Sequence, residues 1–89
     1  MSESTAKNIR EALEEQNPDA LYADGFDNAL IGIAYRFDQM PLACYSYEKV
    51  IANLEEQGMT YDEAVEFYEF NIIGAWMGDG TPVFVAMDF

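Results

Sequence analysis

The spacing of hydrophobic residues divides the first part of the chain into a helix and a loop. Ile9 and Leu13 lie four residues apart in the otherwise polar segment 4–16, which predicts a short helix with a thin apolar face. The Asn-Pro pair at 17–18 ends this helix, because a residue that precedes proline disfavours the helical conformation. The polar, glycine-containing segment 19–28 is predicted to form a loop.

Three segments are rich in residues that favour β-strands. Residues 29–37 (ALIGIAYRF) and 42–46 (LACYS) flank the turn segment 38–41 (DQMP), which predicts a β-hairpin. Arg36 is the only charged residue inside either strand, so we expect the sheet to be covered on at least one face. Residues 83–87 (VFVAM) are predicted to form a last strand.

Two amphipathic helices are predicted between the second and third strands. In residues 47–57, apolar side chains recur at positions i, i+3, i+4 and i+7, while Ser46 supplies an N-terminal cap and Gly58 a C-terminal stop. Thr60 and the residue three positions later, Glu63, match a capping box. The second helix is therefore expected to span residues 61–73. Its inward row is predicted to consist of Tyr61, Val65, Tyr68 and Ile72, widened by Ala64, Phe67 and Phe70.

The predicted elements follow the order α-β-β-α-α-β, which is typical of the α+β class. A three-stranded sheet cannot bury both of its faces alone, so we expect a small antiparallel sheet with two helices packed on one face, plus a short N-terminal helix. Residues 1–18 are interpreted as this N-terminal helix or as a flexible arm, and residues 19–89 as a single acidic domain. The sequence leaves the position of the last strand in the sheet open.

The distribution of charge narrows the range of partners. Seventeen acidic residues stand against four basic ones, which gives a net charge of −13, and no Lys or Arg follows Lys49. Such a chain repels nucleic-acid phosphates and anionic membranes and attracts basic protein surfaces. We therefore expect a protein partner with a basic surface, without direct binding to nucleic acid or membrane. Solubility alone is the alternative explanation of the acidic composition.

The residue types present argue against catalysis. The chain has no histidine and one cysteine, Cys44, so Ser-His and Cys-His pairs, histidine-based zinc sites and intrachain disulfides are excluded. Cys44 itself is predicted to be a small core residue. Asp24 with Asp27, and Glu66 with Glu69, are the carboxylate pairs to consider, but acids this frequent fall close together by chance. We predict that the protein is not an enzyme and has no cofactor, metal or catalytic residues.

The acidic residues of the two later helices form the candidate binding surface. Asp62, Glu66 and Glu69 are spaced i, i+4 and i+7, so they are expected to line the outer face of the longest helix, with neighbours roughly 4.5–6 Å apart along the axis. A carboxylate row at this spacing is comparable to the phosphate spacing of a DNA strand. A solvated helix face that needs no partner is the competing interpretation. The predicted partner-binding residues are Glu55, Glu56, Asp62, Glu66, Glu69 and Trp76, the last at the rim of the contact.

Four segments together resemble a known group of sequences. They are D-N-A-L-I-G-I (27–33), C-Y-S-Y-E-K-V-I (44–51), G-M-T-Y-D-E-A-V-E-F-Y-E-F-N (58–71) and G-A-W-M-G-D-G-T-P-V-F (74–84). Over about residues 26–84 the chain resembles a family of small acidic hypothetical proteins of tailed bacteriophages. The resemblance implies a phage or prophage origin and action in the cytoplasm of the host bacterium, and it brings no activity or catalytic residue.

Two functions are consistent with these patterns. The first is a phage-encoded acidic accessory protein that binds and inhibits a bacterial host protein, such as a nucleic-acid-binding or anti-phage defence component, by presenting a DNA-like acidic surface. The second is a non-enzymatic structural or homo-oligomeric assembly protein of the phage, because the apolar strands at 29–37 and 83–87 place at least one of them at a sheet edge. The absence of an 18-residue apolar run and of a signal-peptide pattern favours the cytoplasm for either function.

Overall fold

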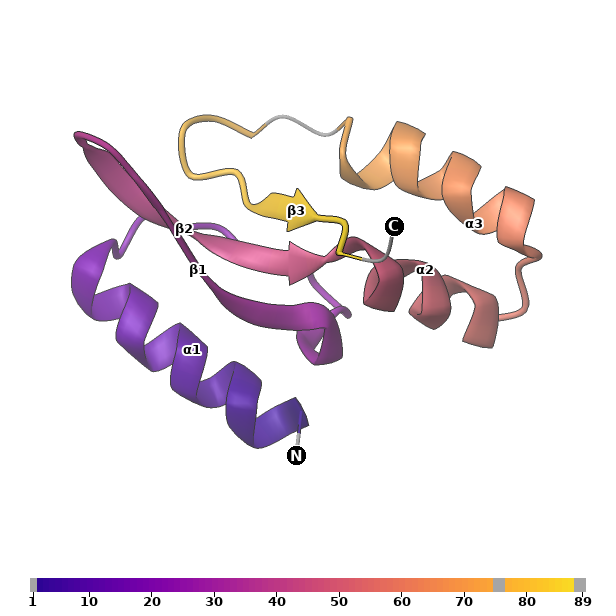
Figure 1. The fold of residues 1–89 in the computed structure, drawn as a ribbon, viewed down its shortest axis with the longest axis horizontal. Coiled ribbons are helices and arrows are strands. Elements are labelled where there is room, and N and C mark those ends of the chain that lie inside the picture. The colour runs from indigo at the N-terminus through magenta and orange to yellow at the C-terminus, as the bar shows by residue number, and fades with distance from the viewer. Residues whose placement is uncertain (1, 75–76, 88–89) are drawn as a thin grey trace.

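The computed structural model describes residues 2–74 and 77–87, with side chains from Thr5 onward. The main helices and strands follow the predicted order α-β-β-α-α-β, which confirms the α+β class (Figure 1). Two short irregular helices, η1 and η2, are added to these elements. The elements are α1 (Ser2–Gln16), η1 (Asp27–Ala29), β1 (Leu30–Arg36), β2 (Gln39–Ser46), α2 (Tyr47–Glu56), α3 (Tyr61–Phe67), η2 (Tyr68–Ile72) and β3 (Val83–Val85).

The three strands form a mixed sheet with β2 in the centre. β1 and β2 pair antiparallel as a hairpin, as predicted, but β3 pairs parallel to β2, with Tyr45 opposite Phe84. The expectation of an antiparallel sheet was therefore wrong for the last strand. The reason is visible in Figure 1: α2 continues in the direction of β2 and α3 runs back along the molecule, so β3 enters the sheet from the same end as β2.

The hairpin turn is tighter than the sequence indicated. Strand β1 ends at Arg36 and β2 begins at Gln39, so the turn consists of residues 37 and 38 and not of the predicted 38–41. Phe37, predicted in the first strand, belongs to this turn. Asp38 has a φ of 61°, the left-handed conformation that closes such a short connection. Pro41 lies inside β2 where the pairing register is irregular, a position that tolerates its missing amide hydrogen.

Helix α1 is part of the hydrophobic core. Leu13 is fully buried and Ala6 almost so, and the helix packs against both strands of the hairpin. At its end the buried Asn17 side chain donates a hydrogen bond of 2.9 Å to the carbonyl oxygen of Pro41. This bond fixes the end of the helix to the start of β2. The sequence left open whether the N-terminal helix packs on the domain. The burial of its apolar face shows that it does.

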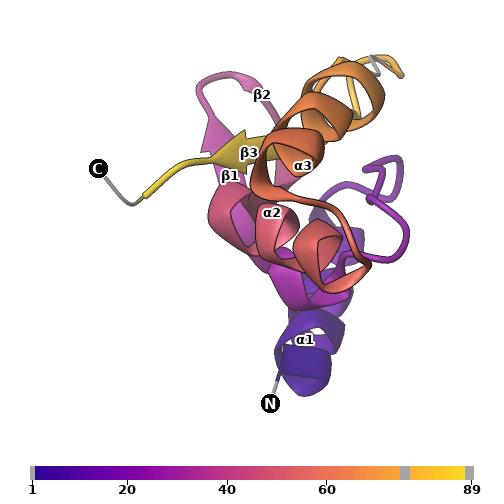
Figure 2. The ribbon, with the colours of Figure 1, turned by 90° about the vertical axis from the view of Figure 1, so that its right-hand side faces the viewer.

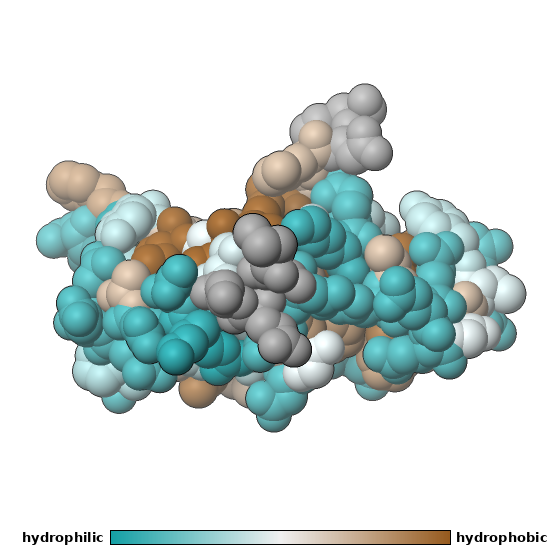
Figure 3. All heavy atoms as spheres, turned by 90° about the horizontal axis from the view of Figure 1, so that it is seen from below, coloured by the Kyte–Doolittle hydropathy of each residue, from teal (hydrophilic) through white to brown (hydrophobic). Residues whose placement is uncertain are grey.

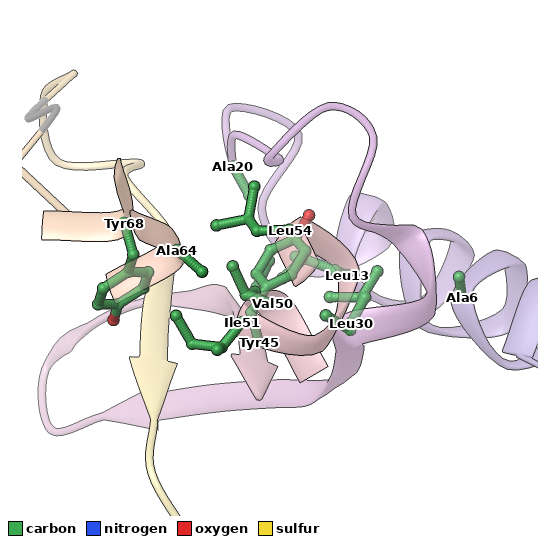
Figure 4. Close-up of a cluster of buried hydrophobic side chains, with 12 residues drawn as sticks. Ala6, Leu13, Ala20, Leu30, Tyr45, Val50, Ile51, Leu54, Ala64 and Tyr68 are labelled. Carbon is green, nitrogen blue, oxygen red and sulfur yellow. The ribbon is translucent and has the colours of Figure 1, made fainter. Parts of the chain in front are cut away.

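A chain of aromatic rings joins the sheet to the later helices. Tyr45 is fully buried near the middle of the core (Figure 4), and its phenol oxygen accepts a hydrogen bond of 2.8 Å from the amide of Ala23. Its ring stacks on Phe84 at 5.4 Å, Phe84 meets Tyr68 edge-on at 5.6 Å, and Tyr68 meets Tyr47 edge-on at 4.9 Å. These contacts hold β2, β3, η2 and α2 together.

The ends of α2 and α3 follow the predicted capping. The Ser46 hydroxyl accepts from the amide of Lys49 at 3.2 Å, and Gly58 has a φ of 108°, which only glycine adopts readily. The capping box is complete: the Thr60 hydroxyl accepts from the Glu63 amide at 3.2 Å, and the Glu63 carboxylate accepts from the Thr60 amide at 2.9 Å.

The second helix is not uniform along its length. The α-helical part stops at Phe67, and residues 68–72 continue as a π-helix. A π-helix has a wider turn, so it changes which side chains face inward after this point. Among the described helices, none is long and apolar enough to cross a lipid bilayer.

Candidate protein-binding surface

Five of the six predicted binding residues lie on the exposed sides of two consecutive helices. Glu55 and Glu56 are in the last turn of α2, Asp62 and Glu66 are in α3, and Glu69 is in η2. All five side chains are exposed. The turn 57–60 joins the end of α2 to the start of α3, so the acids of α2 lie near the beginning of the α3 row. We call these five residues the acidic surface. Trp76 lies outside the described residues.

The acidic surface has little internal neutralisation. The Arg10–Asp27 ion pair, with 2.6 Å between a guanidinium nitrogen and a carboxylate oxygen, involves α1 and none of the five acids of this surface. Within the described part of the chain, Glu55, Glu56, Asp62 and Glu66 make no hydrogen bond through their carboxylates. Their charges are therefore available to a partner rather than used in the fold.

Aromatic side chains lie beside these acids. Phe70 is 75% exposed, Tyr61 is 57% exposed and Phe67 is 38% exposed. The predictions that Tyr61 belongs to the inward row and that Phe67 and Phe70 widen it were therefore wrong. The buried stripe of this helix is narrow: Ala64 and Tyr68 are buried, and Val65 and Ile72 partly so. The π-helix keeps Tyr68 and Ile72 on the inner side and leaves Phe70 on the outer side.

The exposed rings and two carboxylates surround one groove. It has a volume of about 510 Å³, is open to solvent and runs along the outer side of α3. Phe67 and Phe70 provide apolar walls, and Glu63 and Glu66 provide charge. We call this the α3 groove. Its lining residues are Met59, Glu63, Glu66, Phe67, Phe70 and Asn71.

The acidic residues near the N-terminal half have a different environment. Asp27 is paired with Arg10, whose guanidinium also lies 4.2 Å from the ring centre of Tyr22. Partial burial of Arg10 lowers its pKa, but the hydrogen bond and charge of Asp27 outweigh this and raise it above the ordinary value. Asp27 therefore joins η1 to α1. Among the described residues, no group of His, Cys, Asp or Glu side chains is placed to hold a metal ion.

One face of the sheet carries no helix among the described elements. In Figure 2 no helix lies to the left of the sheet, which is the side that faces the viewer in Figure 1. Figure 3 shows hydrophobic residues along the upper edge of the molecule, which is the same side. Since Tyr45 and Phe84 point into the core, their neighbours Cys44, Val83 and Val85 point to the other side, where they are half-buried. We call these three residues the open sheet face.

Cys44 on the open sheet face differs from its prediction as a core residue. The thiol is half-buried because only the inner face of β2 is covered by helices. Burial raises the pKa of the Cys44 thiol, which favours the protonated and less reactive form. A reactive thiolate is therefore not part of the candidate site.

Comparison of the chain with protein-family profiles, with curated proteins and with solved structures found no match.

Proposed function

We propose that this chain is a phage-encoded acidic accessory protein that binds, and thereby inhibits, a basic protein in the cytoplasm of a bacterial host. The partner in this proposal is a nucleic-acid-binding or anti-phage defence protein, and the acidic surface occupies the site where that partner binds phosphates. The protein acts by binding, without catalysis or a cofactor. The observation that carries the proposal is the exposed and internally unpaired set of carboxylates on α2 and α3.

Electrostatics gives this surface its selectivity. No basic residue follows Lys49 in the sequence, so Glu55 and Glu56 at the end of α2 and the acids of α3 and η2 have no basic residue after them in the chain. Such a field steers a basic partner toward the surface and repels nucleic acids and anionic lipids. Because the charges are exposed, salt screens them over a distance of about 8–10 Å at physiological ionic strength. Binding should therefore weaken strongly as salt increases.

Charge reversal on one helix tests the proposal against a matched control. The triple variant Asp62→Lys, Glu66→Lys and Glu69→Lys reverses the α3 row, whereas Glu11→Lys, Glu14→Lys and Glu15→Lys makes the same change in net charge on exposed positions of α1. Pull-down from bacterial lysate at low and high salt, with proteins identified by mass spectrometry, should recover a nucleic-acid-binding protein with wild type and with the α1 variant. DNA should compete for that protein.

The α3 variant should recover none of this partner while retaining the circular dichroism spectrum of the wild type. Equal recovery by both triple variants would show that only total charge matters, and the proposed binding surface would be wrong.

The open sheet face supports a second candidate, a homo-oligomeric assembly protein of the phage. β3 is an edge strand and Cys44, Val83 and Val85 form an apolar area beside it, which a second copy could cover. Light scattering discriminates the two functions. A dimer that persists at low protein concentration and is lost on Val85→Lys favours assembly, whereas a monomer that binds a host protein favours the accessory function.

A further inference from the structure

We propose that the α3 groove binds an arginine side chain of the partner, in preference to lysine. This inference rests on the proposed function and specifies the chemistry that the acidic surface recognises. The groove combines two features that a guanidinium group uses together: flat aromatic walls from Phe67 and Phe70, and carboxylates from Glu63 and Glu66. The occupant is accordingly an arginine-rich segment of a protein.

The aromatic rings of the α3 groove are exposed to solvent. Phe70 is 75% exposed and Phe67 is 38% exposed. Neither ring belongs to the buried stripe of α3. Leaving an apolar ring in water gives no stability, and apolar groups that gather in a groove mark a contact site. The rings lie among carboxylates, so an apolar partner would have to desolvate charge to reach them. A partner group that is both flat and cationic avoids this cost.

The carboxylates of the α3 groove have oxygen atoms available to a partner. Glu66 makes no hydrogen bond to another described residue, and Glu63 accepts from the Thr60 amide through one oxygen, which leaves its second oxygen for a partner. A guanidinium donates from a planar fork of N–H groups and can stack on an aromatic face at the same time. A lysine ammonium is a compact, strongly hydrated charge that uses the carboxylates but gains less from the rings.

The protein itself contains this arrangement once. Arg10 places its guanidinium 4.2 Å from the ring centre of Tyr22 and bonds to the Asp27 carboxylate at 2.6 Å. One ring and one carboxylate thus suffice to hold an arginine in this fold. The α3 groove offers the same pair of groups without an arginine from the described part of the chain, which is why we assign it to an arginine from another protein.

Peptides of equal length and charge test the inference directly. Oligo-arginine and oligo-lysine peptides are titrated into the intact protein by calorimetry at physiological salt. Wild type should bind oligo-arginine about threefold more tightly or better, the size expected for exposed cation–π contacts. Phe70→Leu, which keeps an apolar side chain but removes the ring, should bring the two affinities together.

The hairpin tip provides a matched control for the ring. Phe37 is 97% exposed and lies in the turn between β1 and β2, outside α3. Phe37→Leu should therefore retain the preference for arginine. Circular dichroism verifies that both variants fold, and neither ring is buried in the core.

The outcomes separate this inference from the proposed function. Tight, salt-sensitive and equal binding of both peptides by wild type would overturn the arginine preference while leaving the acidic surface intact. An equal loss of preference in Phe37→Leu and Phe70→Leu would also overturn it. Binding of neither peptide would contradict the inference as well, and the charge-reversal pull-down would then decide the proposed function independently.

Discussion

Tyr68 shows how the interior controls the chemistry of a single side chain. It is buried between α2 and β3, where its ring contacts Tyr47 and Phe84. Burial, together with the charges of Tyr47 and Glu69, raises the pKa of Tyr68 to about 12 from an ordinary value of 10.0. The neutral phenol is therefore strongly favoured in the folded state.

This shift predicts a loss of stability at alkaline pH. Below pH 10 the phenol is protonated in both states, and its favourable burial is fully retained. Between pH 10 and about 12 the unfolded chain releases the proton while the folded protein holds it, so the free energy of unfolding falls as pH rises. Tyr68→Phe keeps both ring contacts and cannot ionise, so it should lose less stability over this interval.

Urea unfolding at neutral pH and at several pH values above 10 measures the difference. At neutral pH the two proteins should have similar stabilities, and the variant should become the more stable one as pH rises. The variant keeps the alkaline sensitivity that comes from Cys44, Tyr22, Tyr45 and Tyr47, whose pKa values burial also raises. Parallel curves for wild type and Tyr68→Phe would refute the assignment.

Residues whose roles depend on nearby sequence were predictable, and those whose roles depend on distant contacts were not. Ser46 and Thr60 cap helices through bonds to amides three residues away, so spacing alone identified them. The exposure of Phe70 and the half-burial of Cys44 depend on which faces the rest of the chain covers. Hydrophobicity alone gives the same expectation for a core ring and for an exposed ring.

At the scale of elements, the capping box of α3 makes a measurable contribution. The Thr60 hydroxyl and the Glu63 carboxylate each satisfy an amide that the helix itself leaves unpaired. Thr60→Ala removes one of these bonds and should lower the free energy of unfolding by about 0.5–2 kcal/mol. Thr60→Ser retains the hydroxyl and should stay within a few tenths of a kcal/mol of wild type. Thermal and urea unfolding of the three proteins provides the comparison.

An equal loss in Thr60→Ala and Thr60→Ser would show that the threonine methyl group, and not the hydroxyl, stabilises this helix start.

The direction of β3 is the element-level feature that the sequence did not reveal. Strand propensity at 83–87 identified the strand, which in the structure is shorter and spans Val83–Val85. Its orientation depends on where the segment between η2 and β3 places the chain. Helix α2 leads away from the end of β2 and α3 runs back, so the chain arrives near the end where β2 begins. From that end, the shorter connection leads into a strand that is parallel to β2. The hairpin required no such information, since its turn is only two residues long.

For the whole molecule, charge was the most predictable property. The five residues of the acidic surface are exposed, because without a basic partner a carboxylate is costly to bury. The α3 groove was not predicted as a groove, since it requires the outward position of Phe67 and Phe70 as well. The acidic half of the candidate site thus follows from the sequence, whereas its aromatic half follows from the fold.

A net charge of −13 also acts on stability, and the position of each acid decides the sign of its effect. Glu55 and Glu56 lie in the last turn of α2, at the negative end of the helix dipole, with no basic residue there. Glu55→Gln with Glu56→Gln should therefore raise the free energy of unfolding by about 0.3–1 kcal/mol for each substitution at low salt. Asp62 lies in the first turn of α3, at the positive end, so Asp62→Asn should lower it.

Both effects should shrink in urea unfolding at high salt, since the charges are exposed. Destabilisation by the glutamine pair would contradict this account. The glutamine pair could fold more stably and yet bind the proposed partner less well. Glu55 and Glu56 would then be retained at a cost in stability. Solubility alone does not explain such a cost, because many less harmful positions could carry the same charge. If binding is unchanged, the contact surface reduces to α3 and η2.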